Sequence, residues 1–135
     1  MTDSLDRGPE PFVANIEQAT LDNDNYRTTL WTGKNLQVTL MCIQPGHDIG
    51  LEVHDTHDQF LRIKAGQATV YTGSSKDNLT SWTANNDDAV LVPAGSWHNL
   101  VNTGDIPLRI YSIYGPPQHP HGTVHVTKED ADASE

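Results

Sequence analysis

The sequence predicts an all-β fold, a sandwich or a closed barrel, in a single domain. Two observations lead to this prediction. Segments rich in β-branched, apolar and aromatic residues are short, and turn-forming residues separate them at regular intervals. No window shows a helical period that is long and capped enough to predict a helix. The chain has 135 residues, which is the length of one domain with one core.

The predicted strands run through the middle of the chain. Residues 26–31 and 36–43 are rich in Thr, Val, Ile and aromatic side chains, and residues 32–35 between them suit a hairpin connection. Further strands are predicted at residues 50–54, 59–64, 68–72, 79–83, 89–92, 98–102 and 108–114. So many short strands in a chain of this length favour architectures that leave few exposed sheet edges.

The chain divides into three predicted parts: an N-terminal arm at residues 1–25, a barrel at residues 26–115, and a strap with an acidic tail at residues 116–135. Residues 12–16 of the arm are a candidate for an extra strand that is exchanged with a partner subunit. The strap is rich in Pro and His and should be extended. The tail from Lys128 onward is expected to be irregular.

Composition excludes several classes of protein. The net charge of −10 comes from 18 acidic and 8 basic residues without any basic cluster, so a nucleic acid would be repelled. No apolar run approaches the roughly 20 residues that cross a bilayer. The first ten residues lack the apolar region of a signal peptide, which predicts a cytoplasmic protein. Cys42 is the single cysteine, so it cannot form an intramolecular disulfide and is expected to be packed.

Four residues form a predicted metal site. Glu52 and His54 are two apart on a predicted strand, so both side chains should point to the same face. Gln59 begins the next strand on its apolar face, and His98 begins a later one. Convergence of these carboxylate, imidazole and amide donors inside one barrel would suit one borderline divalent metal ion, such as Zn, Mn, Fe or Ni. In the alternative reading, Glu52 and Gln59 face solvent and leave His54 inside alone.

Candidate acid/base residues lie outside these strands. His57 follows the first pair of candidate ligands in a loop and could lie at the rim of a pocket. The strap contains His119, His121 and His125; it either lies on the surface or folds over the barrel mouth and brings His119 or His125 close to the pocket. A histidine there would titrate near the working pH, so His57 and His125 are the candidate catalytic residues.

Two stretches resemble the sequence motifs of the cupin superfamily. The first motif has Gly, five residues, His-x-His, three or four residues, Glu, six residues and Gly. Here Gly46 is followed by five residues, Glu52-x-His54, four residues, Gln59, six residues and Gly66, so the spacing is kept while two ligand letters change.

The second motif has Gly, five residues, Pro-x-Gly-x-x-His, and an Asn four residues after the His. Residues 93–98 and Asn102 fit it fully, and Asn102 is expected to form hydrogen bonds rather than to bind metal. Asp87 replaces the leading Gly, a mild change because Asp tolerates the left-handed backbone region. The resemblance implies a double-stranded β-helix, one metal ion near the barrel centre, and a homodimer.

The ligand changes conserve charge. The usual cupin set of three imidazoles and one carboxylate carries one negative charge, and so does the set of Glu, His, Gln and His in this chain. The donor types also resemble those of the mannose-6-phosphate isomerases, cupins with a Gln-x-His pair and a separate Glu and His. Relative to those enzymes, Gln and Glu have exchanged places.

These features predict a metal-dependent enzyme that acts on a small polar metabolite, such as a sugar derivative or a hydroxy or keto acid, with isomerase or lyase chemistry. Fold analogy is a weak guide to reaction type, so two alternatives stay open. One is a metal-dependent dioxygenase, and the other is a non-catalytic cupin that binds a small molecule.

Overall fold

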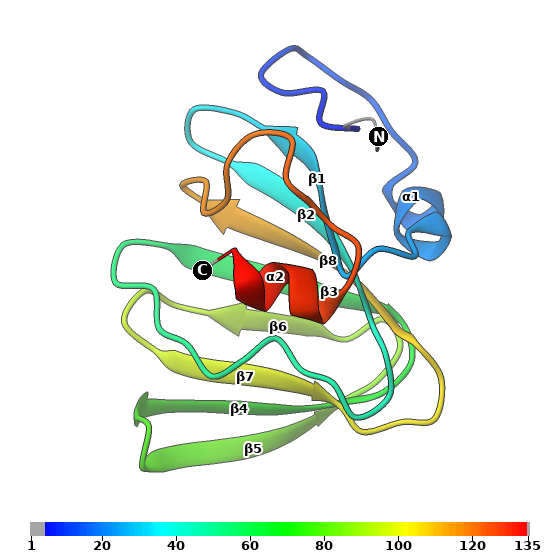
Figure 1. Ribbon diagram of the computed structural model, residues 1–135. Coiled ribbons are helices and arrows are strands. Elements are labelled where there is room, and N and C mark those ends of the chain that lie inside the picture. The colour runs from blue at the N-terminus through cyan, green and yellow to red at the C-terminus, as the bar shows by residue number, and fades with distance from the viewer. Residues whose placement is uncertain (1–4, 135) are drawn as a thin grey trace.

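The computed structural model describes residues 5–134, which form two antiparallel sheets with a shared core (Figure 1). The first four residues of the predicted arm and Glu135 lie outside the described part. The larger sheet has the strand order β6-β3-β8-β2-β1-β9, and the smaller has the order β5-β4-β7. The strands are β1 (Arg27–Thr32), β2 (Gln37–Ile43), β3 (Asp58–Ala65), β4 (Ala68–Ser75), β5 (Asn78–Ala84), β6 (Ala89–Val92), β7 (Trp97–Asn102), β8 (Leu108–Gly115) and β9 (Val124–His125).

The predicted all-β fold is confirmed, and eight of its strands lie within about three residues of their predicted positions. The segment at residues 50–54 is the exception, because it is not a strand. Gly50 has a φ of 89°, which turns the chain out of the extended conformation, and Glu52 alone forms an isolated bridge with His98. The predicted strand was wrong, although the segment still reaches the small sheet.

A helix in the N-terminal arm, α1 (Ile16–Asp22), was not expected from the sequence. Asn15 caps it by accepting a hydrogen bond from the backbone of Gln18 at 3.0 Å. The helix packs Ile16 and Ala19 on a second apolar cluster on the larger sheet. Residues 11–15 have no regular secondary structure, and exchange of this segment with a partner subunit stays a prediction.

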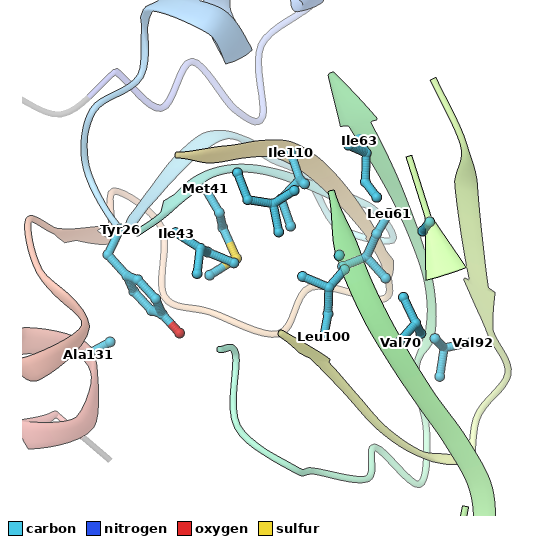
Figure 2. Close-up of a cluster of buried hydrophobic side chains, with 13 residues drawn as sticks. Tyr26, Met41, Ile43, Leu61, Ile63, Val70, Val92, Leu100, Ile110 and Ala131 are labelled. Carbon is cyan, nitrogen blue, oxygen red and sulfur yellow. The ribbon is translucent and has the colours of Figure 1, made fainter. Parts of the chain in front are cut away.

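The acidic tail also forms a helix, α2 (Lys128–Ala133), so the expectation of an irregular tail was wrong there. Thr127 and Asp130 form a capping box in which each side chain accepts a hydrogen bond from the backbone of the other residue. Ala131 is 2% exposed and joins the core cluster that contains Tyr26, and Figure 2 shows the two side by side. Burial of Ala131 therefore anchors the end of the chain.

The main core lies between the two sheets, and its side chains come from both (Figure 2). On β3, Gln59, Leu61 and Ile63 are buried while the alternate residues are more exposed, as the strand period predicts. On the other face, the ammonium group of Lys64 lies 2.7 Å from a carboxylate oxygen of Asp87. Asp87 has a φ of 72°, which confirms the left-handed turn expected where the family motif has Gly. The larger sheet thus presents the polar side chain of Gln59 to the interior.

The first part of the strap, residues 116–123, is fastened to the barrel by side chains from other elements. The amide oxygen of Gln37 accepts hydrogen bonds from the backbones of Gln118 and His119 at 3.0 and 2.9 Å, and its Nε2 donates to the His119 carbonyl at 2.8 Å. Farther along, Gly122 donates its backbone N–H to Asp6 at 3.0 Å. The strap is therefore a fixed part of the fold. Neither helix in the described part of the chain is long and apolar enough to span a bilayer.

Candidate metal centre

Backbone contacts place the first ligand pair against the second motif. Glu52 and His98 exchange two backbone hydrogen bonds of 3.0 and 2.9 Å, although residues 50–54 do not form a strand. The carbonyl of His54 accepts a hydrogen bond of 2.9 Å from Gly95, which lies in the turn before β7. The isolated bridge thus takes over the role that the predicted strand was expected to play.

The side chains of Glu52, His54 and His98 converge. One ligand atom from each lies within 4.8 Å of the other two, which is close enough for a single metal ion to bind all three. Glu52 Oε1 lies 3.2 Å from His54 Nε2 and 3.4 Å from His98 Nε2. The predicted convergence of these three residues therefore appears in the structure, and we call them the ligand triad.

The hydrogen bonding of His98 fits a metal ligand. Its Nδ1 lies 3.2 Å from the carbonyl oxygen of Ser96, and because a carbonyl only accepts, Nδ1 carries the hydrogen. In the neutral ring, Nε2 then carries a lone pair. This nitrogen is buried without a hydrogen-bond partner in the described part of the chain. That lone pair faces the Glu52 carboxylate, so a cation or a proton is needed between them.

The electrostatics of Glu52 point the same way. Burial raises the pKa of the Glu52 carboxyl, but the neighbouring His54 and His98 imidazoles outweigh burial and lower the pKa to about 2. The carboxylate is thus ionised at neutral pH. A partly buried anion between two imidazoles is suited to hold a divalent cation.

Gln59 presents an unsatisfied oxygen to the interior. The side chain is 4% exposed, and its Nε2 donates a hydrogen bond of 2.8 Å to the hydroxyl of Ser112. Its Oε1 is left buried without a partner among residues 5–134. Gln59 pairs with Tyr114 across β3 and β8, and the Tyr114 ring lies 6.1 Å from the His54 ring. The amide therefore lies on the same face of the sheet as Tyr114, while its place as a fourth ligand stays a prediction.

The two candidate catalytic histidines occupy different places. The His57 ring lies 5.8 Å from the His54 ring, at the edge of the triad. Its Nε2 lies 3.0 Å from the carbonyl of Pro117 in the strap. His125 lies on β9, where its Nδ1 is 3.3 Å from a guanidinium nitrogen of Arg27. The structure thus brings His57 to the triad and His125 to Arg27, and the catalytic roles of both stay predictions.

Two buried residues, Tyr114 and Arg27, were not singled out in the sequence. The Tyr114 ring lies close to two histidines, with ring centres 6.1 Å from His54 and 5.4 Å from His119. Arg27 is 6% exposed inside β1. The sequence could have indicated Arg27, because it is the one charged residue in a strand of uncharged residues. A cavity of about 410 Å³ between β6 and the small sheet has none of the triad residues in its lining.

Two antiparallel sheets around one core, with a His and Glu cluster that could hold a metal ion, define the class of small antiparallel β proteins. The chain belongs to the cupin family, since residues 39–114 match the family model of the cupin domain. The fold is thus that of a small single-domain cupin, as the two sequence motifs implied.

Relatives cover almost the whole chain. YrkC of Bacillus subtilis is 57% identical over 131 residues, which are 96% of this chain and 70% of YrkC. L612 of Acanthamoeba polyphaga mimivirus is 35% identical over 91% of this chain and 76% of its own length. The crystal structure of BH2720 from Bacillus halodurans is similar with a TM-score of 0.94 and 57% identity, covering 96% of this chain and 98% of BH2720.

More distant structures share the fold alone. KdgF from Halomonas sp. has a TM-score of 0.60 at 17% identity, covering 68% of this chain and 80% of KdgF. A predicted oxalate decarboxylase from Thermotoga maritima has a TM-score of 0.55 at 19% identity, covering 62% of this chain and 69% of that one. Similarity at this level of identity does not indicate which reaction, if any, this chain catalyses.

Proposed function

We propose that this cupin binds one divalent metal ion through Glu52, His54 and His98, with Gln59 as a fourth donor. We further propose that it is a metal-dependent enzyme with isomerase or lyase chemistry on a small polar metabolite. One observation supports the metal site: His98 Nε2 is buried, has no hydrogen-bond partner within residues 5–134, and lies 3.4 Å from the ionised Glu52 carboxylate. A bound cation would satisfy both groups at once.

The donor set limits the metal and the chemistry. One carboxylate, two imidazoles and one amide suit Zn, Mn, Fe or Ni, and the four donors leave room for water or substrate on metals that accept more ligands. The bound ion would polarise a carbonyl or hydroxyl oxygen of the substrate, which acidifies the neighbouring C–H bond. Among cupins, the donor types resemble those of mannose-6-phosphate isomerases, and this likeness is the support for isomerase over dioxygenase chemistry.

His57 is the better placed of the two candidate acid/base residues. Its Nε2 faces the Pro117 carbonyl at 3.0 Å, which fixes the hydrogen on Nε2 in the neutral ring. The Nδ1 atom of His57 then carries a lone pair that can accept a proton, and it lies 3.0 Å from the hydroxyl of Thr56. Since the ring lies 5.8 Å from that of His54, a substrate bound at the triad would lie within reach of it.

A turnover assay with and without metal tests the proposal. We would load chelator-treated protein with Zn, Mn, Fe or Ni and follow aldoses, ketoses and hydroxy and keto acids by NMR, with oxygen uptake measured in parallel. We expect metal-dependent conversion without oxygen uptake. His57→Gln should lower kcat by about 100-fold or more without changing the metal stoichiometry. The exposed His47 provides the matched control variant, His47→Gln.

Two results would contradict the proposal in different ways. Metal-loaded protein that converts none of these compounds would favour a non-catalytic binding cupin. Conversion coupled to oxygen uptake would establish the dioxygenase alternative instead.

A further inference from the structure

A second site lies under the strap, next to the triad but built from other residues. A cavity of about 240 Å³ is lined there by residues of β1, β9, the strap and the end of α2. Its volume is below the roughly 300–1,000 Å³ of sites for drug-sized ligands, so it suits a compound of a few heavy atoms. All but one of its lining residues have polar side chains: Arg27, Gln118, His119, Pro120, Thr123, His125 and Ser134.

Arg27 is a buried cation without an anionic partner in the part of the chain that the structure describes. Arg27 is 6% exposed, and none of the ion pairs among residues 5–134 includes it. The guanidinium lies 5.4 Å from the centre of the Tyr26 ring and 3.3 Å from Nδ1 of His125. Neither group carries a negative charge that could balance the guanidinium. Its Nε is buried and has no hydrogen-bond partner among the described residues. An unpaired buried charge is costly, so the site is electrostatically complete only with an anion.

His119 adds a second unsatisfied group. Its Nε2 is buried and has no hydrogen-bond partner in the described part of the chain. Burial, with a smaller contribution from Arg27, lowers the pKa of the His119 imidazole to about 3, so the ring is neutral at pH 7. The hydrogen bonds between Gln37 and the His119 backbone fix the base of this side chain. The cavity therefore holds one positive charge and a neutral group that can donate from Nε2.

We propose that this cavity binds the carboxylate of a small organic acid, with Arg27 as its counter-charge and His119 as a second hydrogen-bond donor. A single planar guanidinium matches a single planar carboxylate in both charge and geometry. A phosphate group would bring up to about two negative charges to one cation, in a chain whose net charge is −10. The carboxylate is thus the better fit.

The position of the cavity relates it to the ligand triad. The Tyr114 ring centre lies 5.4 Å from that of His119 and 6.1 Å from that of His54. The acid site and the triad are therefore both adjacent to one aromatic ring. If the proposed function holds, an acid anchored at Arg27 would be the substrate of the triad. The metabolite would then be a hydroxy or keto acid rather than an uncharged sugar. This last step alone rests on the proposed function.

Titration of metal-free protein tests the acid site independently of the metal. The Nε–H signal of Arg27 in ¹H–¹⁵N spectra reports directly on an anion at the guanidinium. We expect acetate, pyruvate and lactate to shift it saturably, and methyl pyruvate, which has the same size without the charge, to leave it in place. Absence of a saturable shift with all three acids, an equal shift with the ester, or tighter binding of inorganic phosphate would each overturn the proposal.

Two variants provide a second test of the acid site. Arg27→Gln should weaken binding of the acids by about 10- to 100-fold, because it removes a charge-assisted hydrogen bond. His119→Phe keeps a ring against Tyr114 and should weaken binding by about tenfold even if the first variant fails to fold. His47→Phe is the control on the surface. Undiminished binding by His119→Phe would overturn the role of His119, whereas intact acid binding in protein that binds no metal would overturn only the proposed function.

Discussion

Glu52 and His98 are joined both through their backbones and through their side chains. Their backbones exchange hydrogen bonds of 3.0 and 2.9 Å, and Glu52 Oε1 lies 3.4 Å from His98 Nε2. Because the bridge fixes both backbones, the carboxylate and the imidazole are held together before any cation binds. A preorganised site loses little conformational freedom on binding, which favours a tight complex.

Replacement of Glu52 should therefore abolish tight metal binding. Glu52→Gln keeps the shape of the side chain but removes the charge of the ligand triad. Since loss of a group that merely supports a ligand weakens metal affinity by about 10- to 100-fold, loss of this ligand should weaken it by at least about 100-fold. Calorimetric titration of chelator-treated protein measures the effect, with Glu10→Gln on the surface as control. Affinity that stays within a few-fold of wild type would show that Glu52 is not a ligand.

Gln59 should matter for the metal more than for the fold. Gln59→Met keeps the length of the side chain and removes both the bond to Ser112 and the unpartnered oxygen. The two losses oppose each other, so unfolding of metal-free protein in urea should change by less than about 1 kcal/mol. Metal affinity should nevertheless fall by about tenfold or more. A destabilised variant with unchanged metal affinity would instead mean that Gln59 is structural.

Asp6 should make stability depend on acid pH. Burial raises the pKa of the Asp6 carboxyl, but hydrogen bonds from Thr32 and Gly122, among others, outweigh burial and hold the pKa below its usual 3.8. A lowered carboxyl pKa stabilises the fold above pH 3.8, and the contribution is lost as the pH falls through the folded-state value. Asp6→Asn should therefore cost about 2 kcal/mol at pH 7 and less below pH 3.8.

Urea unfolding of both proteins between pH 3 and 7 measures this difference, with the exposed Asp105→Asn as control. A stability gap that stays constant over the whole range would show that the Asp6 carboxylate is not the stabilising group.

Asn102 should stabilise the fold without affecting the metal. Its amide nitrogen donates to the carbonyls of Ile43 and Ile106 at 2.8 and 2.9 Å, and its oxygen accepts from Gly104 at 3.0 Å. Asn102→Ala removes three largely buried hydrogen bonds, so we expect a loss of about 3 kcal/mol in unfolding free energy. Metal affinity of the folded variant should equal that of wild type; a marked fall would assign Asn102 to the metal site.

Much of this arrangement could be predicted from the sequence because it depends on local pattern. Alternation along β3 placed Gln59 inside, and the turn before β7 placed His98 and Asn102. The turn preference of Asp87 was likewise readable and is confirmed by its positive φ. These features depend on strand period and turn chemistry, which act within a few residues.

Other features depend on contacts between distant parts of the chain. The strand expected around Glu52 is reduced to one bridge, because Gly50 turns the chain and the partner is on β7. The helix α2 had a readable capping box, but burial of Ala131 against Tyr26 could not be inferred locally. The pairing of Arg27 with His125 joins residues 98 positions apart, so neither residue could indicate the cavity under the strap.

Anomalous scattering from crystals of protein purified without chelators tests the central claim most directly. We expect one strong peak about 2.0–2.2 Å from Glu52, His54 and His98, whose absorption edge identifies the metal. Crystals soaked in Zn, Mn, Fe or Ni that show no peak between these three side chains, or show the ion bound elsewhere, would contradict the proposed metal centre.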